Sequence, residues 1–157
     1  MSSEGIGPTP AFPPSADGSL GIAGALASRL GIEWIEVGPE RVLARMPVAG
    51  NTQSYGVLHG GATAALCETV GSFGTAVAVG LERLPVGVEL NVNHIRSVTQ
   101  GWVTATGVPL HIGRRTCVWE MRVHDDAERL IAVSRLTLVL TGIPPAEPGG
   151  GRVSTSG

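Results

Sequence analysis

The sequence predicts an α+β fold, in which an antiparallel sheet of about six strands wraps around one long central helix. Three observations predict it: a helical apolar run over residues 57–80, two strand-like runs before it and four after it. The chain contains no internal repeat, so we expect a single domain over residues 19–142. Residues 1–18 and 143–157 are rich in Pro, Gly and Ser, which predicts a disordered arm and a disordered tail.

The segment before the central helix divides into a short helix and a strand pair. Residues 20–30 have the small and apolar spacing of a helix, and Gly31 is placed to end it. Residues 32–40 and 41–48 have the composition of two strands, with a Gly-Pro turn signal between them. We therefore expect an antiparallel hairpin that leads, through a loop, into the central helix.

The central helix is apolar on most of its surface. Apolar or small residues follow the three- and four-residue spacing of a helix at Ala62, Ala65, Leu66, Val70, Phe73 and Val77. From residue 61 to residue 80 the helix would run about 30 Å, enough to cross a small domain. We expect it to be buried nearly all round, with Glu68, Ser72 and Thr75 as its one polar line.

One carboxylate and one glycine pair distinguish this helix. A buried carboxylate such as Glu68 costs several kcal/mol unless it is paired, hydrogen-bonded or protonated. Gly60 and Gly61 leave backbone N–H groups uncovered at the positive end of the helix dipole, where an oxyanion can bind. Two interpretations remain open from these features alone: a reaction centre, or a tight glycine turn with a satisfied core acid.

Four strand-like runs follow the helix, at residues 86–95, 101–110, 115–124 and 130–141. In the third run Cys117, Trp119, Met121 and Val123 alternate with polar residues, as in a strand with one buried side. Residues 125–129 form a polar connector of hairpin length. The pattern favours an antiparallel sheet with one face against the helix.

Composition and charge exclude several classes of function. The chain has 157 residues, 43% hydrophobic content and a formal charge of −2 with both signs interspersed, so we expect neither a nucleic-acid partner nor a membrane surface. No stretch has 18 uninterrupted apolar residues, and the N-terminus lacks the pattern of a secretory signal. We expect a cytoplasmic location.

The cysteines and histidines predict no metal site. Cys67 and Cys117 are expected to pack as small hydrophobic residues, and Cys67 points about 100° away from Glu68 on the helix, which disfavours a nucleophilic role. No zinc-type spacing joins His59, His94, His111 and His124.

Five motifs in order carry a resemblance to a known family: GVLHGGATAALCETVGS, GVELNVNHIRS, PLHIGRRT, VWEMRVHD and RLIAVSRLT. Over residues 32–140 the chain resembles the hotdog-fold acyl-CoA thioesterases, in the branch of 4-hydroxybenzoyl-CoA and 1,4-dihydroxy-2-naphthoyl-CoA thioesterases. The resemblance implies hydrolysis of an acyl-CoA without any cofactor, since CoA is part of the substrate, and an aromatic acyl group is ranked above a medium aliphatic chain. The alternatives are an aliphatic acyl-CoA or acyl-carrier-protein thioesterase, a hotdog hydratase or dehydratase, and a non-catalytic acyl-CoA sensor.

The resemblance also implies roles for particular residues. Glu68 is expected to be the catalytic carboxylate, the Gly60 N–H to polarise the thioester carbonyl and Gln53 to contact it, with His59 and Ser72 beside them. The acyl-CoA is expected to contact Gly87, His94, Ile95, Arg96, Ser97, His111, Ile112, Gly113, Arg114, Arg115 and Thr116. Guanidinium groups suit the CoA phosphates. On pattern alone, His94 and Arg96 could instead be ordinary strand residues and Gln53 an ordinary loop amide.

Helix geometry predicts the assembly. Gly60 and Glu68 are eight residues apart, or about 12 Å along the axis, so one helix cannot bring both to one carbonyl. If two copies lie antiparallel across a two-fold axis, the Gly60 end of one faces Glu68 of the other. We expect an obligate homodimer with shared active sites. The resemblance implies that such dimers associate into a homotetramer, which the sequence itself does not decide. The sequence leaves open whether Glu68 attacks directly or activates a water.

Overall fold

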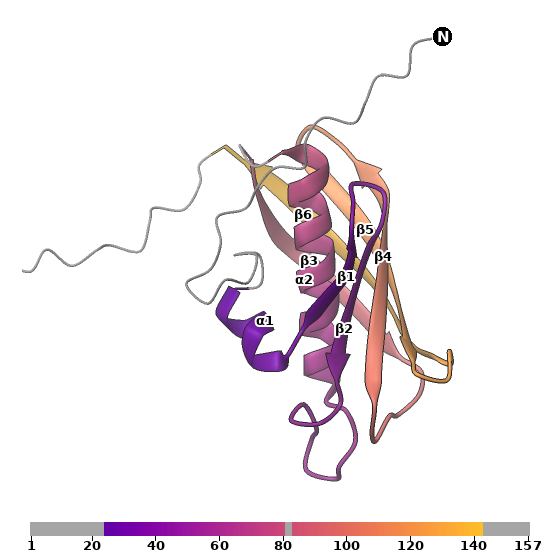
Figure 1. Ribbon diagram of the computed structural model, residues 1–157. Coiled ribbons are helices and arrows are strands. Elements are labelled where there is room, and N and C mark those ends of the chain that lie inside the picture. Colours follow the sequence, from indigo (N-terminus) through magenta and orange to yellow (C-terminus); the bar gives the residue numbers. More distant parts are fainter. Residues whose placement is uncertain (1–23, 81–82, 143–157) are drawn as a thin grey trace, which may run out of the picture.

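The computed structural model describes residues 24–80 and 83–142, and the predicted arm and tail lie outside these residues. A six-stranded antiparallel sheet curls around the long helix α2 (Gly60–Val79), which confirms the predicted fold class (Figure 1). The strands follow the order β1-β2-β4-β5-β6-β3 across the sheet. Their bounds are β1 (Glu33–Val37), β2 (Val42–Pro47), β3 (Leu84–His94), β4 (Trp102–Ile112), β5 (Thr116–Asp125) and β6 (Leu130–Thr141).

The segment before α2 has the predicted helix and hairpin. Helix α1 (Gly24–Leu30) ends where a glycine was expected to stop it, since Gly31 has a φ of +68° and its N–H donates to the Ser28 carbonyl at 3.1 Å. The part of this predicted helix before residue 24 lies outside the described residues. Strands β1 and β2 pair antiparallel, and the Gly38 N–H closes their turn on the Arg41 carbonyl at 2.9 Å.

The core lies between α2 and the concave face of the sheet. The four alternating residues predicted to face inward on β5 are fully buried: Cys117, Trp119, Met121 and Val123. The Trp119 ring lies against α2 at Gly74, where an added Cβ would collide with it. Glycine therefore lets the helix approach the sheet closely, and the bulky indole fills the space at native packing density.

The prediction that α2 is buried all round is wrong. The sheet covers one side, while Val77 and Glu68 lie on a half-buried side. Thr75 does not extend the polar line, because it is buried and its hydroxyl donates to the Gly71 carbonyl at 2.9 Å. Among the described helices α2 is long and apolar enough to cross a membrane, but half of it is buried inside the domain, as in a core helix.

The two edges of the sheet differ. Strand β1 is short, and its Glu33 and Glu36 form ion pairs with Arg45 and Arg41. Strand β3 is eleven residues long, has a bulge at Val88, and leaves 40% of Val86 and 56% of Val88 exposed. An extended, apolar edge strand offers unpaired N–H and C=O groups to another strand.

Candidate active site

The loop before α2 is fixed to its surroundings by a buried amide. The Asn51 side chain donates from Nδ2 to the carbonyls of Leu30 and Pro47, both at 2.8 Å. Further along, the Gln53 N–H donates to the Val57 carbonyl at 2.9 Å and closes a turn. These bonds hold the Gln53 side chain on a short, constrained loop beside the start of α2.

The N-terminus of α2 presents a free backbone donor. His59 caps the helix, with Nδ1 accepting the Gly61 N–H at 2.8 Å. The Gly60 N–H has no hydrogen-bond acceptor among the described residues. An added Cβ on Gly60 would lie 2.9 Å from Nε2 of His94, so glycine allows this imidazole to lie over the first turn. A free N–H at the positive end of a long helix suits a carbonyl oxygen that gains negative charge.

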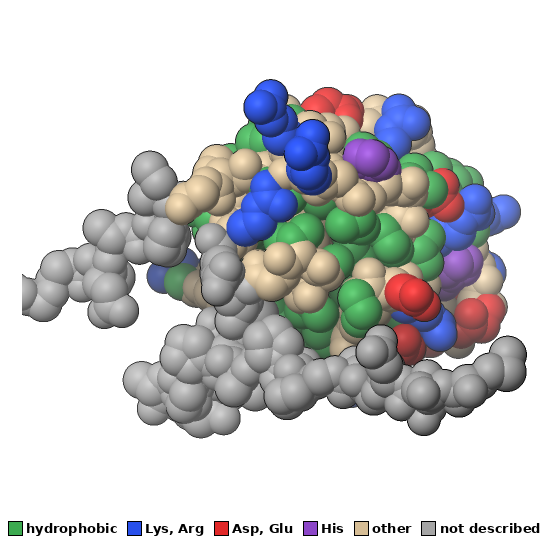
Figure 2. Space-filling view, turned by 90° about the horizontal axis from the view of Figure 1, so that it is seen from above, with side chains coloured by type: hydrophobic (Ala, Val, Ile, Leu, Met, Phe, Trp, Pro, Cys, Tyr) green, Lys and Arg blue, Asp and Glu red, His purple; other side chains and the backbone are tan. Residues whose placement is uncertain are grey.

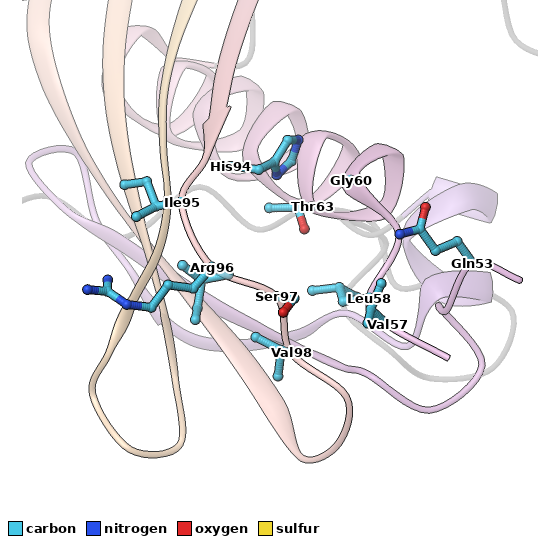
Figure 3. A pocket seen from close by; sticks show the side chains of 11 residues that line it. Gln53, Val57, Leu58, Gly60, Thr63, His94, Ile95, Arg96, Ser97 and Val98 are labelled. Carbon is cyan, nitrogen blue, oxygen red and sulfur yellow. The ribbon is translucent and has the colours of Figure 1, made fainter. Parts of the chain in front are cut away.

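A pocket of about 370 Å³ opens at this helix end (Figure 3). Its lining residues are Gln53, Val57, Leu58, Gly60, Thr63, His94, Ile95, Arg96, Ser97, Val98 and Ile131. The pocket thus joins the two residues expected at the thioester carbonyl, Gln53 and Gly60, with residues 94–97, which were expected to contact the acyl-CoA. Figure 3 shows Gln53 and Gly60 at one side and Arg96 at the other.

The expected catalytic carboxylate lies outside this pocket. Glu68 is half-buried on α2, and the Ser72 hydroxyl donates to its Oε1 at 3.5 Å. A Cβ on Gly87 of β3 would collide with the same oxygen, so this glycine makes room for the carboxylate. Burial raises the pKa of Glu68 above its usual range, and the Ser72 hydrogen bond opposes that rise.

Within one chain the pocket and the carboxylate stay apart. Gly60 and Glu68 belong to one continuous helix, so about 12 Å separates them along its axis. One subunit therefore holds the residues expected at the active site in two separate sets: Gln53 and Gly60 at the pocket, and Glu68 with Ser72 and Gly87 beyond it.

A third predicted group lies at the opposite end of the sheet from the pocket (Figure 1). It consists of His111, Ile112, Gly113, Arg114, Arg115 and Thr116, where β4 turns into β5. The Gly113 N–H closes this turn on the Thr116 carbonyl at 2.9 Å, and the Arg83 guanidinium donates to the Arg114 carbonyl. Figure 2, which looks onto this end, shows basic side chains and a histidine gathered there.

Several residues at these sites were missed by the sequence analysis. Thr63 lies three residues after Gly60, on a helical spacing that could have indicated it. Val98 and Ile131 come from segments far apart in the sequence, and Arg83 joins the basic group through a contact that no local pattern indicates.

Among the described residues, the cysteines and the groups that could bind a metal do not form a second site. Cys67 and Cys117 are buried, and burial raises the pKa of Cys67 to about 12, which keeps its thiol protonated. In the part of the chain that the structure describes, no three His, Cys, Asp or Glu side chains are grouped so that they could hold a metal ion.

A long helix inside a curled antiparallel sheet is the architecture of the hotdog fold. The thioesterase HI1161 of Haemophilus influenzae has the same fold, with a TM-score of 0.74 and 37% identity over 78% of this chain and 87% of that one. The proofreading thioesterase EntH of Cronobacter turicensis is 40% identical over 120 residues, which are 76% of this chain and 88% of EntH. The 1,4-dihydroxy-2-naphthoyl-CoA hydrolase of Listeria monocytogenes is 35% identical over 116 residues, which are 73% of this chain and 94% of that enzyme.

The Thioesterase superfamily matches residues 55–132, a range that includes the start of α2, Glu68 and the pocket residues 94–98. The chain belongs to this superfamily and is a thioester hydrolase.

Proposed function

We propose that this enzyme hydrolyses aromatic acyl-CoA thioesters to the free acid and CoA, in a homodimer whose two active sites are shared between subunits. The observation that carries the proposal is the separation of the two sets. The pocket with Gly60 and Gln53 lies about 12 Å along α2 from Glu68, so a second subunit must supply the carboxylate.

In the proposed reaction the substrate carbonyl oxygen accepts hydrogen bonds from the Gly60 N–H and the Gln53 amide. Both bonds strengthen as the oxygen becomes anionic, so they stabilise the transition state more than the ground state. Glu68 of the partner subunit attacks the carbonyl carbon, or takes a proton from a water that attacks it. The C–S bond then breaks, and CoA leaves as a thiolate that takes up a proton. In the direct route, water then hydrolyses the acyl-Glu68 anhydride, which releases the free acid and restores the carboxylate.

The exposed edge of β3 supports this assembly. If the β3 strands of two copies pair antiparallel about a two-fold axis, they extend the sheet and place both α2 helices on one face, side by side and antiparallel. Glu68 lies against Gly87 of β3, so this pairing brings the carboxylate toward the partner. The exposed Val86 and Val88 would also be covered.

The same pairing accounts for the two distant groups of expected CoA contacts. His94 is the last residue of β3 and Arg96 follows just after it, whereas the turn with Arg114 and Arg115 lies beside the start of β3. Antiparallel pairing sets the start of one β3 against the end of the other. The arginine pair of the partner subunit therefore approaches the pocket mouth, where its guanidinium groups would bind the CoA phosphates.

The aromatic acyl group is the finer part of the proposal. It is supported by the similarity to an enzyme named as a 1,4-dihydroxy-2-naphthoyl-CoA hydrolase and by the motifs of residues 94–97 and 109–116. In the proposed dimer the free donors of Gly60 and Gln53 face the Glu68 carboxylate of the other subunit, which favours turnover over a sensor that only binds acyl-CoA.

A thiol-release assay on a panel of acyl-CoAs tests the proposal. We expect the highest kcat/KM with benzoyl-, hydroxybenzoyl- or dihydroxynaphthoyl-CoA. A higher value with decanoyl-CoA would overturn the aromatic assignment. Binding of every acyl-CoA without thiol release would support the sensor instead.

A further inference from the structure

The threonines of α2 do not all use their hydroxyls in the same way. Thr69 donates from Oγ1 to the Ala65 carbonyl at 2.7 Å, and Thr75 donates to the Gly71 carbonyl at 2.9 Å. Both hydroxyls are thus satisfied by the carbonyl one turn earlier, as is usual for threonine inside a helix. The hydroxyl of Thr63 has no hydrogen-bond partner among the described residues.

The position of Thr63 directs this free hydroxyl toward the pocket. Thr63 is only 2% exposed, yet it lines the pocket at the N-terminus of α2. The carbonyl one turn earlier belongs to His59, and it accepts the N–H groups of Ala62 and Thr63 itself. The Thr63 hydroxyl is not among the fully enclosed side-chain atoms that lack a partner, so it keeps a small surface that opens into the pocket. A ligand in the pocket would supply the missing partner.

The place of Thr63 in the pocket indicates which part of the ligand it meets. In Figure 3, Thr63 lies between Arg96 on one side and Gln53 and Gly60 on the other. It is three residues beyond Gly60, or about 4.5 Å along the helix axis. The group that binds Thr63 is therefore close to the thioester carbonyl, on the way toward the charged mouth of the pocket.

We propose that the Thr63 hydroxyl hydrogen-bonds the pantetheine amide nearest the thioester. This inference rests on the proposed function, because it takes the carbonyl to lie at Gly60 and the CoA phosphates toward Arg96. Two methylene groups separate that amide from the sulfur, which matches one helical turn. The hydroxyl can donate to the amide carbonyl or accept from the amide N–H. Thr63 thereby contributes to recognition of the carrier arm rather than of the acyl group.

The surroundings of Thr63 suit such an arm. Leu58, Val98 and Ile131 form apolar walls of the pocket, and these can cover methylene groups. Ser97 lies beside the same path (Figure 3). An amide that crosses an apolar channel needs a polar partner, since its own desolvation is costly.

Substitution of Thr63 separates its role from catalysis. Thr63→Val keeps the shape and removes the hydroxyl, Thr63→Ser keeps the hydroxyl, and Thr75→Val is the matched control on the same helix. The substrates are benzoyl-CoA, S-benzoyl-N-acetylcysteamine, which retains only the first amide, and S-ethyl thiobenzoate, which has none. For Thr63→Val we expect KM to rise about three- to tenfold on the two amide substrates. The kcat values, and the KM for S-ethyl thiobenzoate, should stay at the wild-type level. Thr63→Ser and Thr75→Val should keep the wild-type KM.

An unchanged KM on every substrate would overturn the inference. An equal change of KM on all three substrates would also overturn it, because it would place the hydroxyl at the carbonyl or in the core. Thermal melting identifies folded variants, and Thr63→Ala supplies a second protein without the hydroxyl if Thr63→Val does not fold.

Calorimetric binding of free CoA gives a readout that does not depend on turnover. CoA should bind about three- to tenfold more weakly to Thr63→Val than to the wild type. If CoA binds the wild type more tightly than Thr63→Val by this factor, but the wild type hydrolyses no thioester, the proposed function fails and the role of Thr63 stands. If it hydrolyses acyl-CoA and the variant binds CoA equally well, the role of Thr63 fails and the function stands. A wild type that neither binds CoA nor hydrolyses thioesters overturns both.

Discussion

Mixing two defective variants tests whether the active site is shared between subunits. Gln53→Ala removes a donor at the pocket, and Glu68→Ala removes the carboxylate that lies about 12 Å away along the helix. Each variant alone forms dimers in which every site has a lesion. In a mixed dimer one site carries both lesions and the other carries neither, because the intact glutamine of one subunit faces the intact glutamate of the other.

The expected recovery follows from this geometry. Random exchange makes half of the dimers mixed, and half of the sites in each mixed dimer are intact, so thiol release should recover to about a quarter of the wild-type rate. Native mass spectrometry of an isotope-labelled variant measures the mixed fraction, and a thiol-release assay follows activity over the same time.

A second mixture provides the control. Glu68 and Ser72 lie on the same helix and are joined by a hydrogen bond, so they serve the same site. Mixing Glu68→Ala with Ser72→Ala leaves one lesion in every site, and activity should stay at the level of the unmixed proteins. Verified exchange of Gln53→Ala with Glu68→Ala, without recovered activity, would refute the shared site and the obligate dimer.

Two further predictions concern the carboxylate and the basic turn. Glu68→Gln should lower turnover by about two to four orders of magnitude while substrate binding persists. Burial raises the pKa of Glu68 in the folded protein, so its contribution to stability is greatest at low pH and is lost as pH rises through that pKa. Glu68→Gln should therefore have a higher melting temperature than the wild type at neutral pH, but not in acid. Equal melting temperatures of the two proteins at both pH values would contradict the burial argument. Replacing Arg114 and Arg115 together by Ala should weaken transition-state binding of acyl-CoA by about 1 to 3 kcal/mol, with little effect on a short thioester without the nucleotide. Equal losses on both substrates would make these arginines ordinary surface residues.

Local chemistry was sufficient to predict the elements of the fold. Gly31 ends α1 because its positive φ suits glycine, and that preference is visible in the sequence. The inward alternation that includes Trp119 was visible for the same reason, since a strand with one buried side has a period of two. These features depend on one residue and its near neighbours.

The errors on α2 arise from contacts with distant parts of the chain. Periodicity identifies an apolar helix, but not how much of it the sheet covers, so the half-buried side with Val77 was missed. Thr75 was placed with Glu68 because both are polar, although its hydroxyl is satisfied by the helix backbone. Thr63 was overlooked because a threonine in a helix becomes informative only when its missing partner and the pocket are known.

The two glycines in these sets illustrate the same limit. The sequence allowed Gly60 to be read as part of a tight turn, but neither Gly60 nor Gly87 has a positive φ, so neither is required by its own backbone. Each instead lacks a side chain because another group occupies that space: the imidazole of His94 lies over Gly60, and the carboxylate of Glu68 lies against Gly87. In both cases the neighbour comes from the other element of the α2–β3 pair. The close packing of this one helix on one edge strand thus shapes the surroundings of both glycines. It leaves Gly60 and Glu68 about 12 Å apart along the helix, and in the proposed dimer a second copy of the chain brings the two groups together.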